Sequence, residues 1–139
     1  MLSTKTLAEL IRRKHAVLVE LCDIGRRQQR VVASGETATL LQLLSSKQTL
    51  ISSLQQLERE MAPYHAENPD DRIWPSAAER ARCAQQADEC NQLLEQIVTL
   101  EKDSADRMTA RRNDVAAQLR QVYAAGQARD AYAANVSRT

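Results

Sequence analysis

The chain has 139 residues, of which 43% are hydrophobic and 3% aromatic, and its 19 basic and 18 acidic residues give a formal net charge of +1. This near-neutral balance argues against sequence-independent binding to nucleic acid, which needs a concentrated positive surface. Because Gly and Pro number only three each, turns must be few and elements long. Ala, Leu, Gln, Glu and Arg dominate, and these helix formers predict an all-α protein.

The first predicted helix covers residues 4–33. Ser3 or Thr4 is expected to cap its start, and Gly35 suits the left-handed residue that commonly follows a helix end. A seven-residue repeat is two helical turns, so apolar residues at this spacing form a stripe along one side of the helix. The stripe residues that show the repeat are Leu10, Val17, Ile24 and Val31.

The second predicted helix covers residues 37–62, and Pro63 is expected to end it. The connection 34–36 is so short that the first two helices must form an antiparallel hairpin. A loop follows, in which Ile73 and Trp74 are expected to cover the end of the bundle. The apolar stripe of the second helix consists of Leu40, Leu43, Leu44, Leu50, Ile51, Leu54, Leu57 and Met61.

The third predicted helix covers residues 77–125, and Ser76 with Glu79 forms a capping box at its start. A hairpin of roughly 44 Å covers only about 29 residues of such a helix. The part of the third helix that the hairpin can cover therefore ends inside the charged segment 101–107, which interrupts the apolar stripe. Beyond it the stripe resumes with Met108, Val115, Leu119, Val122 and Tyr123.

Two continuations are open at this interruption. The chain can turn at Asp103–Ser104 and add a fourth helix, or the third helix can continue and offer its distal stripe to a partner. Since no Gly or Pro interrupts the segment, we expect the continuous helix. The predicted fold is an antiparallel helical hairpin plus a long third helix, an elongated, coiled-coil-like three-helix bundle. We expect one domain over residues 1–126 and a flexible tail over 127–139.

The sequence offers little for chemistry. Cys83 and Cys90 stand about 10.5 Å apart along one helix, too far to share a zinc ion or form a disulfide, and are interpreted as core residues. His15 and His65 have no nucleophile at catalytic spacing, so we expect no enzyme, cofactor or metal. Three cysteines without a secretory leader predict a cytoplasmic protein. No apolar run approaches the ~20 residues of a membrane span.

Residues 35–58 carry a resemblance to a known family. They read Gly-Glu-x-x-x-Leu-x-x-Leu-Leu-x-x-Lys-Gln-x-Leu-Ile-x-x-Leu-x-x-Leu-Glu, which resembles the flagellar export chaperones of the FlgN type. The resemblance implies a cytosolic helical chaperone that binds the helical end of hook-filament junction proteins (hook-associated proteins) and delivers them to the export apparatus. It also implies that the C-terminal part takes the client helix and that a tyrosine, Tyr123 or Tyr132, docks to the export gate.

The candidate partner-binding site therefore lies on the distal part of the third helix. An amphipathic client helix would bury its apolar stripe there, with the two arginines engaging acidic groups at the rim. The alternative is a non-enzymatic coiled-coil scaffold in which the same stripe forms a homodimer. The candidate residues are Met108, Arg111, Arg112, Val115, Leu119, Val122 and Tyr123, with Tyr132 as the candidate for export-gate docking.

Overall fold

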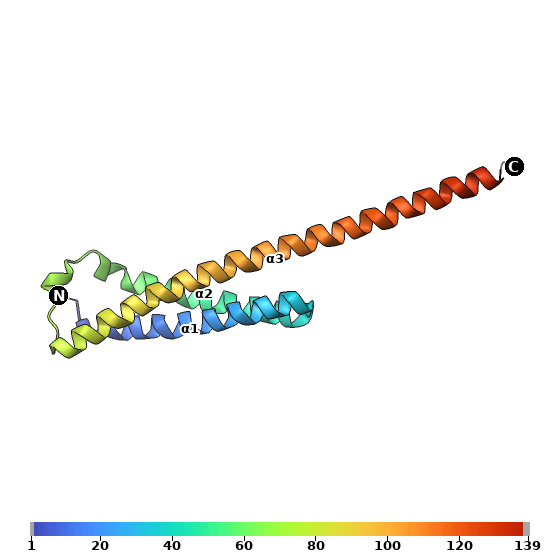
Figure 1. Ribbon diagram of the computed structural model, residues 1–139. Coiled ribbons are helices and arrows are strands. Elements are labelled where there is room, and N and C mark those ends of the chain that lie inside the picture. Colours follow the sequence, from blue (N-terminus) through green and yellow to red (C-terminus); the bar gives the residue numbers. More distant parts are fainter. Residues whose placement is uncertain (1, 138–139) are drawn as a thin grey trace. The chain divides into compact units, whose positions relative to one another are not determined.

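The computed structural model describes the backbone of residues 2–137 and the side chains of residues 2–124. Over this range the chain forms three α-helices, one short 3-10 helix and no strand (Figure 1), which confirms the predicted all-α class. The helices and their bounds are α1 (Thr4–Ser34), α2 (Thr37–His65), η1 (Pro69–Asp71) and α3 (Ala77–Ser137).

The chain divides into two compact units, Met1–Ser104 and Ala105–Thr139. The first unit contains α1, α2, the loop and the first part of α3; the second contains the rest of α3. The prediction of a single domain over residues 1–126 stays a prediction.

Short-range signals set the ends of the helices in the first unit. Ser3 Oγ accepts a hydrogen bond from the Thr6 backbone N–H at 3.3 Å and so caps α1. Gly35 follows α1 with φ 77°, and its N–H donates to the Val31 carbonyl at 2.9 Å. This left-handed residue, which glycine adopts without steric cost, joins α1 to α2 as an antiparallel pair (Figure 1). Ser76 Oγ accepts from the Glu79 N–H at 3.2 Å, as expected for the start of α3.

The predicted end of the second helix at Pro63 is wrong, because α2 includes Pro63 and continues to His65. Pro63 has no N–H to donate to the Arg59 carbonyl, so this turn of α2 has one backbone hydrogen bond fewer. Tyr64, which is only 5% exposed, packs into the core. Its hydroxyl donates to the Ser3 carbonyl at 2.9 Å. These contacts favour one further turn of helix.

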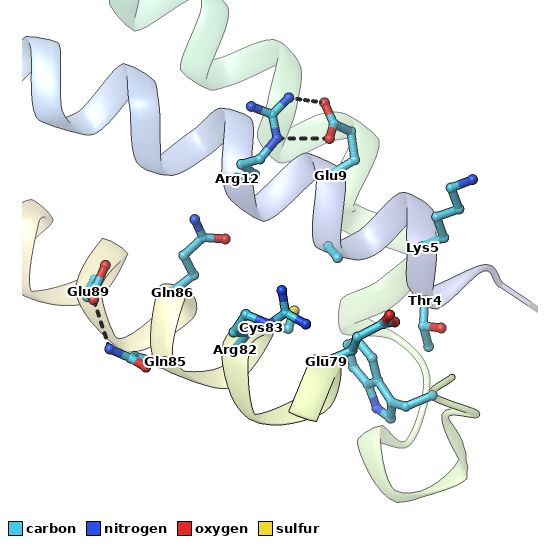
Figure 2. A pocket seen from close by; sticks show the side chains of 12 residues that line it. Thr4, Lys5, Glu9, Arg12, Glu79, Arg82, Cys83, Gln85, Gln86 and Glu89 are labelled. Atoms are coloured by element: carbon cyan, nitrogen blue, oxygen red, sulfur yellow. Dashed lines mark hydrogen bonds and ion pairs between the residues drawn. The ribbon is translucent and has the colours of Figure 1, made fainter. Parts of the chain in front are cut away.

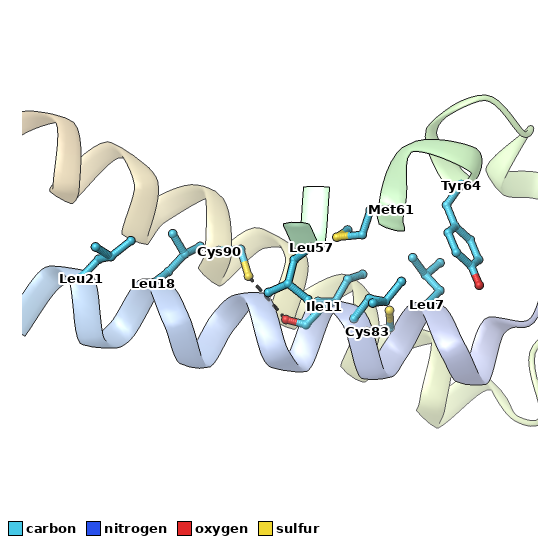
Figure 3. Close-up of a cluster of buried hydrophobic side chains, with 10 residues drawn as sticks. Leu7, Ile11, Leu18, Leu21, Leu57, Met61, Tyr64, Cys83 and Cys90 are labelled. Atoms are coloured by element: carbon cyan, nitrogen blue, oxygen red, sulfur yellow. Dashed lines mark hydrogen bonds between the residues drawn. The ribbon is translucent and has the colours of Figure 1, made fainter. Parts of the chain in front are cut away.

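The core of the first unit is a cluster of buried side chains from all three helices (Figure 3). Leu18, in the middle of α1, is 0% exposed. Cys83 and Cys90 of α3 are buried free thiols within the cluster, as predicted. Trp74 packs against the cluster and covers its end, but Ile73 is 68% exposed, so the expectation for Ile73 is wrong. The Ile73 carbonyl instead accepts a hydrogen bond from the Thr4 hydroxyl at 2.8 Å.

The charged interruption of the α3 stripe begins in a polar layer made by Gln28, Lys47 and Glu101, one residue from each helix. Lys47 Nζ donates to Gln28 Oε1 at 3.1 Å and to the two Glu101 carboxylate oxygens at 2.8 and 2.9 Å. Gln28 is 3% exposed, and so its amide depends on this bond. Beside the layer, Gln29 donates to Asp103 and Ser104 is 2% exposed.

The polar layer accounts for the loss of apolar spacing without a break in the helix. The structure assigns one α-helix from Ala77 to Ser137, and no new helix begins at Asp103 or Ser104. The alternative of a turn into a fourth helix is therefore wrong. Glu101 and Asp103 are polar because polar partners on the other two helices face them.

Gly25 lets α1 and α3 approach closely just before the polar layer. A Cβ atom at this buried position would lie 3.0 Å from Leu100 Cδ1 and 3.3 Å from Leu100 Cβ. Contacts this short leave no room for a larger residue unless Leu100 moves. The glycine thus holds this part of α3 against the hairpin.

Candidate functional site

The second unit carries the apolar surface that the sequence predicted for a partner. We call the five residues Met108, Val115, Leu119, Val122 and Tyr123 the distal stripe. Their exposed fractions are 41%, 47%, 64%, 66% and 67%. They make up half of the exposed large hydrophobic side chains in the described range. Clustered apolar exposure of this kind marks interaction surfaces in soluble proteins.

Helical geometry places the charges around this stripe. At 100° per residue, Met108, Val115, Leu119 and Val122 fall within an arc of about 60°, whereas Tyr123 lies about 70° from its centre. Arg111 and Arg112 lie on opposite sides of the arc, each about 50° from its centre. Asp106 and Asp114 lie more than about 100° away. The exposed apolar strip is therefore flanked by positive charge, and the two acids of this segment face elsewhere.

Two parts of the prediction fall beyond the described side chains. The side chain of Tyr132, the candidate for gate docking, lies outside the described residues. Helix α3 extends to Ser137, past the predicted helix end at residue 125. The flexibility of residues 127–139 stays a prediction.

A polar groove of about 570 Å³ lies in the first unit where α1 and α3 begin (Figure 2). Its charged lining is balanced in sign. Arg12 donates two hydrogen bonds to Glu9, and the bonds from Arg12 lower the pKa of the Glu9 carboxyl. Charges that alternate along two neighbouring helices are typical of a solvated seam. The charged residues of the groove are Lys5, Glu9, Arg12, Glu79, Arg82 and Glu89.

A second hollow, which we call the apolar cavity, has a volume of about 410 Å³ and is lined by residues of α1, α2, α3 and the loop between α2 and α3. Sequence reasoning missed it, since it depends on how three helices and the loop diverge. Its apolar lining comes from Leu7, Ile11, Met61, Trp74, Cys83, Ala84, Ala87 and Cys90, beside Tyr64 and Pro69. Its remaining lining residues are Lys14, His65, Arg72, Arg80 and Asn91, and none is acidic.

The three thiols are protected by their surroundings. Burial raises the pKa of Cys22, Cys83 and Cys90, with Arg72 opposing the effect at Cys83 and Lys14 opposing it at Cys90. The Cys22 thiol also donates to the Leu93 carbonyl at 3.6 Å. Because the thiolate is the reactive form, a raised pKa lowers reactivity at neutral pH. The arrangement is that of core thiols.

We expect these thiols to make the fold less stable in alkali. Unfolded thiols ionise near pH 8.5, and the raised folded pKa means that the folded state retains its protons longer. Their stabilising contribution is thus complete below the unfolded pKa and is lost as pH rises through the folded pKa. The urea midpoint of the unmodified protein should decrease as the pH rises from about 7.5 to about 10. The urea midpoint of the Cys90→Ala variant should decrease less over the same pH range. Equal slopes for the two proteins would contradict this expectation.

Among the residues that the structure describes, no group of three or more His, Cys, Asp or Glu side chains is placed to hold a metal ion. Over the same range, no helix combines the length and apolar character that crossing a membrane requires. His15 Nε2 lies 2.9 Å from a Glu89 carboxylate oxygen, which pairs α1 with α3.

Comparisons of the chain with protein-family models, with curated proteins and with solved structures return no match. The resemblance drawn from residues 35–58 therefore rests on those residues alone. Lys47, the most specific residue of that resemblance, also has a structural role, because it lies at the centre of the polar layer. The sequence does contain a signal for the polar layer, because Gln28 and Glu101 occupy stripe positions where apolar residues are expected. The spacing alone does not show that these two residues share Lys47 as a partner.

Proposed function

We propose that this protein is a non-enzymatic chaperone of flagellar type III export. It binds the helical terminus of hook-filament junction proteins in the cytoplasm and delivers them to the export apparatus, where Tyr132 contacts the export gate. The observation that carries the proposal is the exposed distal stripe flanked by Arg111 and Arg112. The resemblance of residues 35–58 supplies the family and the client class.

Capture uses the packing of one amphipathic helix against another. Burying roughly 400 Å² of apolar surface contributes about 10 kcal/mol before costs. Lost rotational freedom and ordering of both partners offset much of this. The net binding free energy that is left is moderate, which suits a chaperone that must release its client at the export apparatus.

The flanking charge favours a client over a second copy of the chain. In a parallel, in-register pair, Arg112 of each copy would lie beside Arg112 of the other, and like charges at an interface are unfavourable. A client helix with acidic residues beside its apolar stripe instead meets opposite charge. We therefore expect the client segment to be an acidic amphipathic helix.

The double variant Val115→Asp/Leu119→Asp tests this site. It places two charges in the distal stripe and should abolish pull-down of a junction protein, while circular dichroism shows the helices retained. The matched control, Thr109→Asp/Asn113→Asp, adds two Asp residues to the other face of the same segment and should bind normally. Undiminished capture by the stripe variant would contradict the proposed site.

The homodimer remains the second candidate, because an exposed stripe serves self-association as well. Multi-angle light scattering separates the two functions. A dimer that persists on dilution and is lost in Val115→Asp would favour the scaffold, whereas a monomer that captures a junction protein favours the chaperone.

A further inference from the structure

We propose that the apolar cavity of the first unit binds a small amphiphilic anion, a molecule with an apolar body and one anionic head group, such as a medium-chain carboxylate. This site is separate from the distal stripe. The inference does not depend on the proposed function, because every residue that carries it belongs to the first unit.

The cavity has the size and lining of a small-molecule site. Its volume of about 410 Å³ falls within the range of roughly 300–1,000 Å³ that ligand pockets occupy, and such pockets are mostly apolar with a few polar groups. Ala84 and Ala87 form much of the α3 wall, where larger residues would fill the space. Apolar walls offer water few hydrogen-bond partners.

The cavity is bounded at both ends, which favours a short molecule over a continuous helix. At one end the loop residues Arg72 and Trp74 line it. At the other end the helices pack closely, since Leu18 and Leu57, the next inward residues of α1 and α2, are 0% and 3% exposed. A long helix needs a groove that is open at its ends.

The polar groups select an anion. Lys14 Nζ is neutralised by Glu58 at 2.6 Å, and Arg72 donates to Glu67 at 2.7 Å and to the Tyr64 carbonyl at 2.8 Å. Arg80 differs, because its guanidinium makes no hydrogen bond or ion pair to any residue of the described range. With no acidic residue in the lining, Arg80 is its one uncompensated cation, and it can pair with a single anionic head group.

Charge-matched amphiphiles test the inference on the intact protein. Isothermal titration below the micelle concentration should show saturable one-to-one binding of decanoate. The cationic counterpart, decyltrimethylammonium, has the same tail and should not bind. Equal binding of both amphiphiles, or no saturable binding of decanoate, would overturn the proposal.

Variants on one helix locate the site. Arg80→Glu should weaken decanoate binding by about tenfold. The matched control Arg82→Glu makes the same change in the neighbouring polar groove and should leave binding unchanged. Ala87→Leu fills the cavity and should abolish binding. Equal affinities for the two Arg→Glu variants would contradict the site.

The natural thiols give a readout in the unmodified chain. Cys83 and Cys90 line the cavity, whereas Cys22 does not. Decanoate should slow alkylation of Cys83 and Cys90 relative to Cys22, as measured by peptide mass spectrometry. Equal protection of all three thiols would indicate a general stabilisation and overturn the assignment. None of these measurements involves residues 108–123, so their failure leaves client capture unaffected.

Discussion

Leu18→Ala is expected to lower the free energy of unfolding by about 2–5 kcal/mol. Leu18 is 0% exposed and belongs to the cluster that α1, α2 and α3 share. Truncation removes its buried methyl groups and leaves a space that three packed helices cannot fully close. Urea denaturation followed by circular dichroism measures the loss.

Val19→Ala is the matched control, since Val19 is the next residue of α1 and is 39% exposed. Its effect should stay below about 1 kcal/mol. The two variants differ mainly in burial, so equal losses would mean that the core does not lie where the structure places it.

Lys47→Met is expected to cost about 1–3 kcal/mol. The Lys47 side chain is only 15% exposed and its ammonium donates to Gln28 and to both Glu101 oxygens. Methionine keeps the length of the chain but leaves the buried Gln28 amide oxygen without its donor. Glu101, at 43% side-chain exposure, can turn to water, so most of the cost falls on Gln28.

The double variant Lys47→Met/Gln28→Leu checks this explanation. Replacing both partners with apolar groups removes the unpaired oxygen, and the free energy of unfolding should recover part of the loss. Lys102→Met, an exposed lysine beside Glu101, should change stability little. A loss of unfolding free energy in the double variant that equals or exceeds the sum of the losses in the two single variants would contradict the polar layer as the cause.

Local features were predictable from the sequence because their causes lie within a few residues. Ser3, Gly35 and Ser76 mark helix ends through bonds to residues three or four positions away. The seven-residue spacing likewise identified the stripes, since it depends only on helical geometry. The exposed distal stripe follows from the same spacing.

Features that depend on tertiary contacts were missed. The extension of α2 past Pro63 depends on Tyr64 reaching Ser3, 61 positions away in the chain. The exposure of Ile73 follows from a loop path fixed by Thr4 and Arg72. The apolar cavity depends on residues from three helices and the loop together. No repeat or propensity in the chain encodes such an arrangement.

The polar layer also decides how α3 is aligned on the hairpin. A repeat of seven makes a slip by seven residues the nearest competing register of α3. In that slip Cys90 would replace Cys83, Ile97 would replace Cys90 and Leu100 would replace Leu93, so apolar residues would still face the hairpin at these three positions. Glu101 opposes such a slip. Leu94 or Met108, the residues seven positions away, would then face Lys47, and neither offers the carboxylate to which Lys47 donates. One carboxylate thereby disfavours a slip that the apolar positions alone would oppose less strongly.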